Sequence, residues 1–340
     1  MSNALRWVVL VAFISLTICG NMLVCLAVAT SRHLHQISSC FIVSLAVTDL
    51  LLGLLVLPLS AMLELRNGRW PLGGVLCNIY ISLDVMLCTA SILTLLAISV
   101  DRYLAICSPL CYPRKVTPLR VAITLTAIWV CSLAVSFLSI HLGWNTPDFR
   151  LQNQHWDMWD EGEEGRTCRY EWNNNYVLLG AFGIFYLPLL VICGMYHRIF
   201  CVAREQVRRI RATTPSFAQS DSAAATLREH KATVTLAAVL GAFVICWFPY
   251  FTYLICMGMW AEKTPSNLLH SVVLWLGYLN SALNPILYPA LNRDFRRAYG
   301  QLLRCRCANQ GGFLFFPPFQ NKQTLIIHRH QNDPKQTDSS

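Results

Sequence analysis

Seven long apolar stretches constrain this chain of 340 residues more than any other feature of its sequence. An α-helix needs about 20 mostly apolar residues to cross the roughly 30 Å hydrocarbon core of a bilayer. The stretches lie at about 7–29, 40–63, 75–103, 120–142, 176–203, 229–258 and 268–290. The sequence therefore predicts an all-α membrane protein built as a seven-transmembrane helix bundle.

The amino-acid composition agrees with a membrane protein. Hydrophobic residues make up 55% of the chain and charged residues 13%, about half the charged share of a typical soluble domain. Such a chain has too few polar side chains to cover a surface that faces water. A net charge of +9 can indicate nucleic-acid binding, but the basic residues lie between the apolar stretches and form no patch interleaved with aromatics. Nucleic acid is therefore not an expected partner.

The distribution of charge predicts how the bundle is oriented. Lys and Arg concentrate on the cytoplasmic side of membrane proteins. In this chain they gather in the connections after the third and fifth spans and beyond the seventh, whereas the connection at 143–175 is rich in Asp and Glu. We therefore expect residues 1–6 to be extracellular, the tail to be cytoplasmic, and the chain to be a multi-pass protein of the plasma membrane.

A short amphipathic cytoplasmic helix is expected at 292–303, directly after the seventh span. Phe295 and Tyr299 are spaced for one apolar face that lies on the membrane surface. The helical domain then covers 7–303, and the polar tail at 304–340 is expected to be disordered. Cys305 and Cys307 follow the surface helix at positions suited to palmitoylation. That they are two ordinary cytosolic thiols stays open.

Asp84, in the outer half of the third span, is the most informative ionisable residue. A charged group inside a membrane span is expensive and marks a functional site by default. No span offers Lys or Arg at its depth, and an unpaired buried carboxylate is strongly unfavourable. A cationic ligand that enters from outside would relieve this cost. The alternative, a structural acid hydrogen-bonded to Tyr278, is compatible with ligand binding.

Aromatic residues of the sixth and seventh spans are candidates for the walls of the same pocket. Aromatic faces attract ammonium groups, and an acidic external loop would enrich cations at the entrance. Ordinary helix packing is the competing interpretation for each ring. The candidates are Trp247, Tyr250, Phe251, Trp275 and Tyr278.

Asp49, near the middle of the second span, belongs to a different polar group. It is expected to lie near Ser91 of the third span and near three polar residues of the seventh, namely Asn280, Ser281 and Asn284. Oxygen ligands of this kind can hold a small cation such as sodium, or a network of water molecules. Apart from this possible allosteric sodium ion, no cofactor is expected.

Motifs along nearly the whole chain resemble the rhodopsin-like family of G-protein-coupled receptors. Each motif is weak alone, but together they occur in the family's order and on the matching spans. They are Gly20-Asn21, Leu45-Ala46-Val47-Thr48-Asp49, Cys77, Asp101-Arg102-Tyr103, Trp129, Pro188 with Tyr196, Cys246-Trp247-Phe248-Pro249 and Asn284-Pro285-Ile286-Leu287-Tyr288. The resemblance implies a Cys77–Cys168 disulfide, an outward ligand pocket and a cytoplasmic cleft for a heterotrimeric G protein. It also implies arrestin and a receptor kinase as partners.

The resemblance further implies a two-state switch at the cytoplasmic end. Arg102 would be held at rest by Asp101 and by Glu229 at the inner end of the sixth span, although Glu229 as a solvated surface charge stays an alternative. Activation would swing the sixth span about Pro249. A final set of residues would rearrange with it, namely Tyr103, Tyr196, Asn284, Pro285 and Tyr288.

Asp84 at its position resembles the anchor of the aminergic members, and the chain looks most similar to their type-2 histamine group. Val85 and Cys88 would line the pocket beside it. That group implies a stimulatory G protein and a rise in cAMP. The fifth span departs from it, because Gly180 and Ile184 stand where the group has an Asp and a Thr for the imidazole end of histamine. A trace-amine or other monoamine receptor, or a divergent paralogue with a weak histamine response, stays an alternative.

Other membrane-protein classes fit the sequence poorly. An opsin or light-driven pump needs a lysine in the seventh span, where Tyr278 takes the matching position. A secondary transporter would show internal repeats. An enzyme needs a nucleophile and base or a metal cluster, and His141 and His270 lack partners at ligand spacing. The chain also has no N-glycosylation sequon and a very short segment before the first span, so a truncated gene product is a further alternative.

Overall fold

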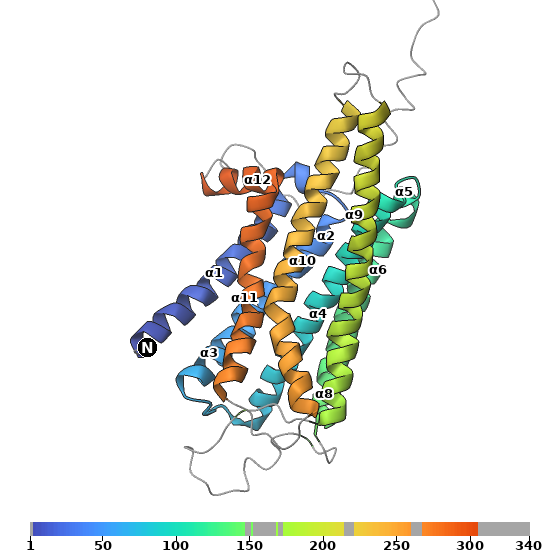
Figure 1. Ribbon diagram of the computed structural model, residues 1–340. Helices are drawn as coiled ribbons and strands as arrows, with labels where there is room; N and C mark the ends of the chain where they lie inside the picture. The colour runs from blue at the N-terminus through green and yellow to red at the C-terminus, as the bar shows by residue number, and fades with distance from the viewer. Residues whose placement is uncertain are drawn as a thin grey trace, which may run out of the picture. The chain divides into compact units, whose positions relative to one another are not determined.

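The computed structural model describes residues 3–146, 151, 168, 173–213, 221–259 and 267–304, without the side chains of 3, 203 and 206–236 (Figure 1). The chain divides into two compact units, 1–300 and 301–340. The first unit contains the helical bundle and every site discussed below. Of the second unit, the described residues are the end of the last helix and Arg304.

The described part of the chain is helical, and its elements follow the order of the predicted spans. They are α1 (Asn3–Thr30), η1 (Arg32–Leu34), α2 (Ser39–Leu51), η2 (Leu52–Val56), α3 (Leu57–Leu65), α4 (Gly73–Cys107), α5 (Tyr112–Lys115), α6 (Pro118–Leu133), η3 (Ala134–Leu138), α7 (Ser139–His141), α8 (Asn174–Gly180), η4 (Ala181–Tyr186), α9 (Leu187–Thr213), α10 (Asp221–Met259), α11 (Asn267–Leu291) and α12 (Arg293–Leu303). Elements η2, η3 and η4 are π-helical turns inside longer rods.

Six continuous rods are long and apolar enough to cross a membrane among the residues described. They are Ala4–Thr30, Ser39–Leu65, Gly73–Cys107, Pro118–His141, Asn174–Val202 and Ala237–Met259. The seventh rod, α11, carries buried Asn280, Ser281 and Asn284 on its inward face, which lowers its hydropathy. It packs along α10 in the most extensive helix pairing of the bundle. The protein is thus an all-α membrane bundle, as its sequence predicts.

Several helices run further than the apolar stretches indicate. Helix α1 begins at Asn3, α9 continues to Thr213 and α10 begins at Asp221. These extensions interrupt their apolar residues with Arg, Glu, Asp, Ser or Asn. They therefore carry no signal of membrane burial, although they still form backbone hydrogen bonds along the helix. Figure 1 shows α9 and α10 reaching beyond the other helices at one end of the bundle.

Prolines determine where two of the rods change their hydrogen-bond pattern. The π turn η2 ends two residues before Pro58, and η4 ends two residues before Pro188. Proline offers no backbone N–H and crowds the carbonyl four residues earlier, so the wider turn accommodates it. Pro249 lies within α10, and Pro285 and Pro289 within α11. Membrane helices tolerate such breaks when neighbouring groups satisfy the backbone.

Helix α4 has neighbours on several sides and so positions the site. It contacts α2, α6 and α9, and its outer end is tied down by the Cys77–Cys168 disulfide that the sequence resemblance implied. The turn before it places Asn67, Gly68 and Gly73 at positive φ. Trp70 in this turn donates its ring N–H to the Gly73 carbonyl over 2.9 Å and stacks on Tyr80. The start of α4 is thereby fixed.

Helix α12 follows α11 after Asn292, as a surface helix placed one residue later than expected. Phe295 and Ala298 are buried, and Phe295 stacks on Tyr288 with ring centres 5.2 Å apart. The Tyr299 hydroxyl donates to the Pro285 carbonyl over 3.3 Å. These contacts hold the first two turns of α12 against the inner end of α11.

Candidate functional site

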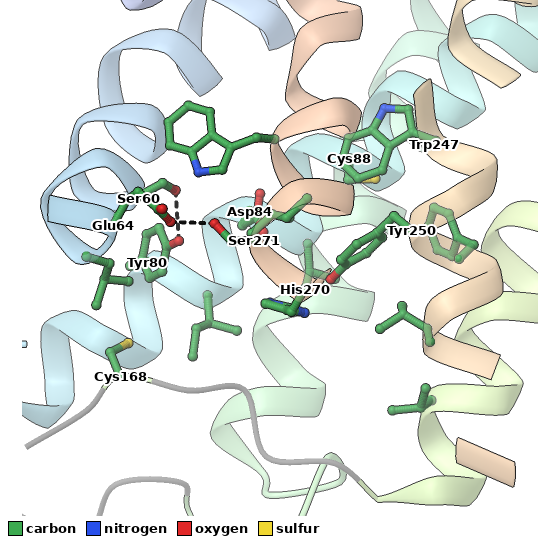
Figure 2. A pocket seen from close by; sticks show the side chains of 18 of the residues that line it. Ser60, Glu64, Tyr80, Asp84, Cys88, Cys168, Trp247, Tyr250, His270 and Ser271 are labelled. Carbon is green, nitrogen blue, oxygen red and sulfur yellow. Dashed lines mark hydrogen bonds between the residues drawn. The ribbon is translucent and has the colours of Figure 1, made fainter. Parts of the chain in front are cut away.

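A cavity of about 570 Å³ opens among α1, α3, α4, α8, η4, α10 and α11. This volume suits a small organic ligand. Nine of the ten residues predicted to bind a ligand line it, and Figure 2 shows several of them. They are Asp84, Val85, Cys88, Gly180, Ile184, Trp247, Tyr250, Phe251 and Trp275.

Tyr278 is the predicted residue that does not line the cavity. It is fully buried, and its ring packs edge-on against Trp247 and Trp275, with centre distances of 6.3 and 5.6 Å. Its hydroxyl still lies within reach of the Asp84 carboxylate. Tyr278 therefore lies outside the cavity lining and contacts residues that line it, namely Asp84, Trp247 and Trp275.

Asp84 has an unsatisfied oxygen at the cavity. Its Oδ1 atom is buried and has no hydrogen-bond partner among the described residues. Asp84 and Cys88 are one turn apart on α4 and share a face, so both reach the same space. A carboxylate that is screened from water and short of partners is a strong acceptor for an ammonium group.

Polar side chains from three helices meet behind Asp84. The Ser60 hydroxyl on α3 lies 2.8 Å from the Tyr80 hydroxyl on α4 and donates to the Tyr278 hydroxyl on α11 over 3.4 Å. Because α3, α4 and α11 each contribute one hydroxyl, the network fixes the relative depth of these helices. Asp84 is held in that frame.

Trp247 is confined between α10 and α11. It meets Tyr250 edge-on at 5.7 Å and Phe251 at 6.0 Å. A Cβ atom added at Gly277 would lie 2.8 Å from two atoms of the Trp247 ring, which is closer than such contacts occur. Gly277 therefore leaves the space that the indole occupies at the base of the cavity.

The wall formed by α8 and η4 is apolar, and we refer to Val177, Gly180, Ala181 and Ile184 as the α8 wall. A Cβ atom built on Gly180 would meet no heavy atom within 4 Å, so this wall is hollow at that position. Tyr176, beside it, donates its hydroxyl to Ser139 over 2.7 Å. Gly180 and Ile184 thus line the cavity and offer no side-chain hydrogen bond there.

Several cavity residues with polar side chains were not singled out by the sequence as ligand contacts, among them Arg6, Glu64, His270 and Ser271. The Ser271 hydroxyl donates to the Glu64 carboxylate. Glu64 was missed because the second apolar stretch was expected to end at 63, so its carboxylate was treated as extramembrane. The sequence did contain one signal for Glu64: it is a carboxylate that lies one residue beyond the predicted end of the second span.

At the cytoplasmic end of α4, Asp101 has several partners. Its carboxylate accepts from the Arg102 guanidinium in a salt bridge and from the Tyr112 hydroxyl over 2.9 Å. Burial raises the pKa of Tyr112, which lies outside the membrane spans, so its hydroxyl stays protonated and able to donate. Tyr196 on α9 lies within electrostatic range of Arg102. Helix α10 includes position 229, but the Glu229 side chain lies outside the described residues.

The remaining predicted switch residues occupy the inner halves of α4 and α11. Tyr103 is half-buried next to Arg102. Tyr288 is buried, and Pro285 sits inside α11 against Gly20 of α1, whose added Cβ would come within 2.6 Å of the proline ring. Helices α1 and α11 are therefore in close contact at this level.

Asp49 is bonded to two of its four predicted neighbours. Its oxygens accept from the Ser281 hydroxyl over 2.7 Å and from the Asn284 amide over 2.8 Å. Ser91 and Asn280 are buried, with no hydrogen bond to Asp49 among the described contacts. The side-chain carbonyl oxygens of Asn280 and Asn284 lack a partner there. These oxygens fit a small cation or water. The two lipidation candidates, Cys305 and Cys307, lie outside the described residues.

The sequence matches the family described as 7 transmembrane receptor (rhodopsin family) over residues 20–288. This match covers most of the chain and includes both ends of the bundle. The chain belongs to the rhodopsin family of seven-transmembrane receptors. The receptor is accordingly a multi-pass plasma-membrane protein, and its membership of a receptor family excludes the enzyme classes considered above.

Named relatives are similar to the receptor over most of their own length. The histamine H2 receptor of Homo sapiens is 55% identical over 303 residues, which cover 89% of this chain and 80% of the relative. The histamine H2 receptor of Rattus norvegicus is 55% identical over 302 residues, with the same coverage. The alpha-1A adrenergic receptor of Homo sapiens is 36% identical over 351 residues, covering 92% of this chain and 72% of the relative.

Proposed function

We propose that the receptor binds histamine or a related biogenic amine in the cavity and signals through a heterotrimeric G protein of the stimulatory class. The observation that carries the proposal is Asp84, a carboxylate in the cavity with an oxygen that lacks a hydrogen-bond partner among the residues that the structure describes. An ammonium group would supply the missing partner, and the pair would be strengthened by the low dielectric of the bundle.

The aromatic lining supports a cationic ligand. Trp247, Tyr250 and Phe251 form one contiguous cluster on α10, and Trp275 of α11 lines the same cavity. Ring faces stabilise an ammonium group by up to about 2 kcal/mol when water is excluded. The histamine H2 receptors that are 55% identical favour histamine as the amine.

The proposed signal passes from the cavity to the cytoplasmic end through α10. A ligand that contacts Trp247 would favour one of two states in proportion to its difference in affinity for them. Outward movement of α10 about Pro249 would then release Arg102 from Asp101 and open a cleft for the G protein. Arrestin, a receptor kinase and lipid attachment at Cys305 and Cys307 are proposed from family membership, and sodium at Asp49 from its oxygen ligands.

A second candidate ligand is a monoamine with a less polar end group. The α8 wall favours it, because Gly180 and Ile184 provide no hydrogen bond to a heterocycle. A buried ring nitrogen without a partner there would lose about 1 to 3 kcal/mol. Histamine is then expected to act, but at higher concentration than a ligand with matched groups on both sides.

The test is a cAMP assay in cells that express the receptor, with a panel of histamine, phenethylamine-type and catecholamine ligands. We expect at least one amine to raise cAMP and Asp84→Asn to abolish the response at equal surface expression. Asp84→Glu is the matched variant, because it keeps the charge, and it should retain part of the response. A full histamine response in Asp84→Asn would disprove the assignment of Asp84, and silence towards every amine would reject the function.

A further inference from the structure

The cavity holds a second carboxylate in addition to Asp84. Glu64, from the last turn of α3, lines the same space, and Figure 2 shows it joined to Ser271 of α11. Ser60 and Glu64 are one turn apart on α3, and Ser271, Trp275 and Tyr278 follow one face of α11. We refer to Ser60, Glu64, Ser271 and Trp275 as the α3–α11 wall. The α3–α11 wall offers polar groups to the cavity, whereas the α8 wall is apolar.

The position of Glu64 relative to Asp84 follows from helix geometry. Asp84 is level with the Tyr278 hydroxyl, whereas Glu64 is level with Ser271, seven residues earlier on α11. Seven residues correspond to about 10 Å along an α-helix. The Ser60 hydroxyl also contacts the Tyr278 hydroxyl, and Glu64 is one turn, about 6 Å, beyond Ser60 on α3. The two carboxylates are therefore separated by roughly 6 to 10 Å along the bundle, with Glu64 nearer the extracellular mouth.

Glu64 is available to a cation. It is half-buried, and no salt bridge engages it within the described part of the chain. The Ser271 hydroxyl occupies one of its oxygens and orients the group, which leaves the other oxygen for a ligand. Trp275, one turn further along α11, places an aromatic ring on the same wall.

The charged and titratable groups around this position include Arg6 on α1 and His270 on α11, which both line the cavity. Arg6 is a fixed positive charge and opposes a cation near Glu64. The two carboxylates exceed Arg6 by one unit of charge, so the cavity as a whole remains attractive to cations while His270 is neutral.

We propose that Glu64 is a second cation anchor and that the receptor selects elongated amines with a basic group at each end. This inference rests on the proposed function, since Asp84 must hold the first ammonium group. Histamine carries a single ammonium group and would engage Asp84 alone. A diamine whose nitrogens are roughly 6 to 10 Å apart would reach both carboxylates, which at roughly 1.2 Å per bond corresponds to about four to eight carbon atoms.

The experiment measures thermal stabilisation of the purified full-length receptor in detergent. A ligand that binds the folded state raises its melting temperature, and at a fixed ligand concentration the rise grows with the logarithm of affinity. The probes are α,ω-diaminoalkanes of about three to ten carbons and monoalkylamines of the same lengths. For the wild type, diamine affinity should rise with length to a single maximum between about four and eight carbons, at least about tenfold above the matched monoalkylamine.

Glu64→Gln should remove this maximum and lower the long diamines to the level of monoalkylamines, whose own binding stays unchanged. Glu64→Asp keeps the charge on a shorter arm and should move the maximum to a longer diamine. Arg6→Gln should raise the affinity for diamines by removing a like charge. Glu205→Gln, the same chemical change on an exposed residue of α9, is the control and should match the wild type.

The two proposals fail in different ways. If diamines show no length optimum, or if Glu64→Gln retains it, the second anchor is wrong while amine binding at Asp84 stands. If Asp84→Asn binds monoalkylamines as well as the wild type does, the proposed function is wrong, and the second anchor is lost with it.

Discussion

Helix α4 carries one carboxylate at each end of the receptor, and their surroundings are opposite. Asp84, in the outer cavity, has an oxygen with no hydrogen-bond partner in the described part of the chain. Asp101, 17 residues and about 25 Å further along the helix, is satisfied by Arg102 and Tyr112. An unsatisfied charge favours whatever supplies its partner, whereas a satisfied charge holds its surroundings in place. Asp84 at the outer end can therefore gain an ion pair with a ligand, whereas a change of state at the inner end requires Asp101 to lose its ion pair with Arg102.

The largest expected effects come from removing each charge in turn. Asp84→Asn should lower amine potency by at least about thirtyfold, because loss of one partner from a buried charge pair costs about 2 to 5 kcal/mol. Asp101→Asn should instead raise cAMP without ligand, because Arg102 is released. Basal and amine-stimulated cAMP at matched surface expression measure both changes.

The double variant Asp84→Asn with Asp101→Asn tests whether the two ends are separate. It should keep the raised basal cAMP of Asp101→Asn and lack the amine response. Basal activity that returns to the wild-type level in the double variant would show that Asp84 itself drives the active state, which contradicts the comparison.

Trp247 lies between the two ends, and Gly277→Ala tests its confinement. The new methyl group would meet the indole at 2.8 Å, so either the ring or α11 must move, at a cost of about 1 to 3 kcal/mol. We expect a lower melting temperature and a basal cAMP different from that of the wild type. Gly300→Ala, at a position where an added Cβ meets nothing within 4 Å, is the matched control. An unchanged basal signal with unchanged stability would show that Trp247 is free to adjust.

A smaller effect is expected from adding polar groups to the α8 wall. Gly180→Asp with Ile184→Thr should raise histamine potency by about tenfold, because each side chain offers a hydrogen bond to the imidazole ring. The Gly180 position has room for the new side chain. Gly180→Val with Ile184→Val, which adds bulk without polarity, separates hydrogen bonding from filling of the hollow. Equal potency for both pairs would indicate that histamine does not point toward this wall.

The fold was predictable because every span must cross the hydrocarbon core of the bilayer, which requires about 20 apolar residues that are visible in the sequence. The polar extensions of α9 and α10 were not, since helix formation outside the membrane leaves no apolar signal. The cavity lining followed from Asp84 and the aromatic residues, but Tyr278 was placed at its surface instead of behind it. The Tyr278 ring is packed against both Trp247 and Trp275. Contacts of this kind between helices decide which ring faces the cavity. Glu64 was missed because the second apolar stretch was expected to end one residue before it, and its partner Ser271, 207 residues away, gives no local signal.

The smallest expected effect concerns the second partner of Asp101. Tyr112→Phe removes one hydrogen bond of 2.9 Å and leaves the Arg102 salt bridge intact, so it should weaken the resting state by about 0.5 to 1.5 kcal/mol. Basal cAMP should then rise less than in Asp101→Asn. Because Tyr112 acts through Asp101, adding Tyr112→Phe to Asp101→Asn should change basal cAMP no further. Additive effects in this cycle would mean that Tyr112 restrains the receptor through another contact, and the inner end would no longer be governed by one satisfied carboxylate.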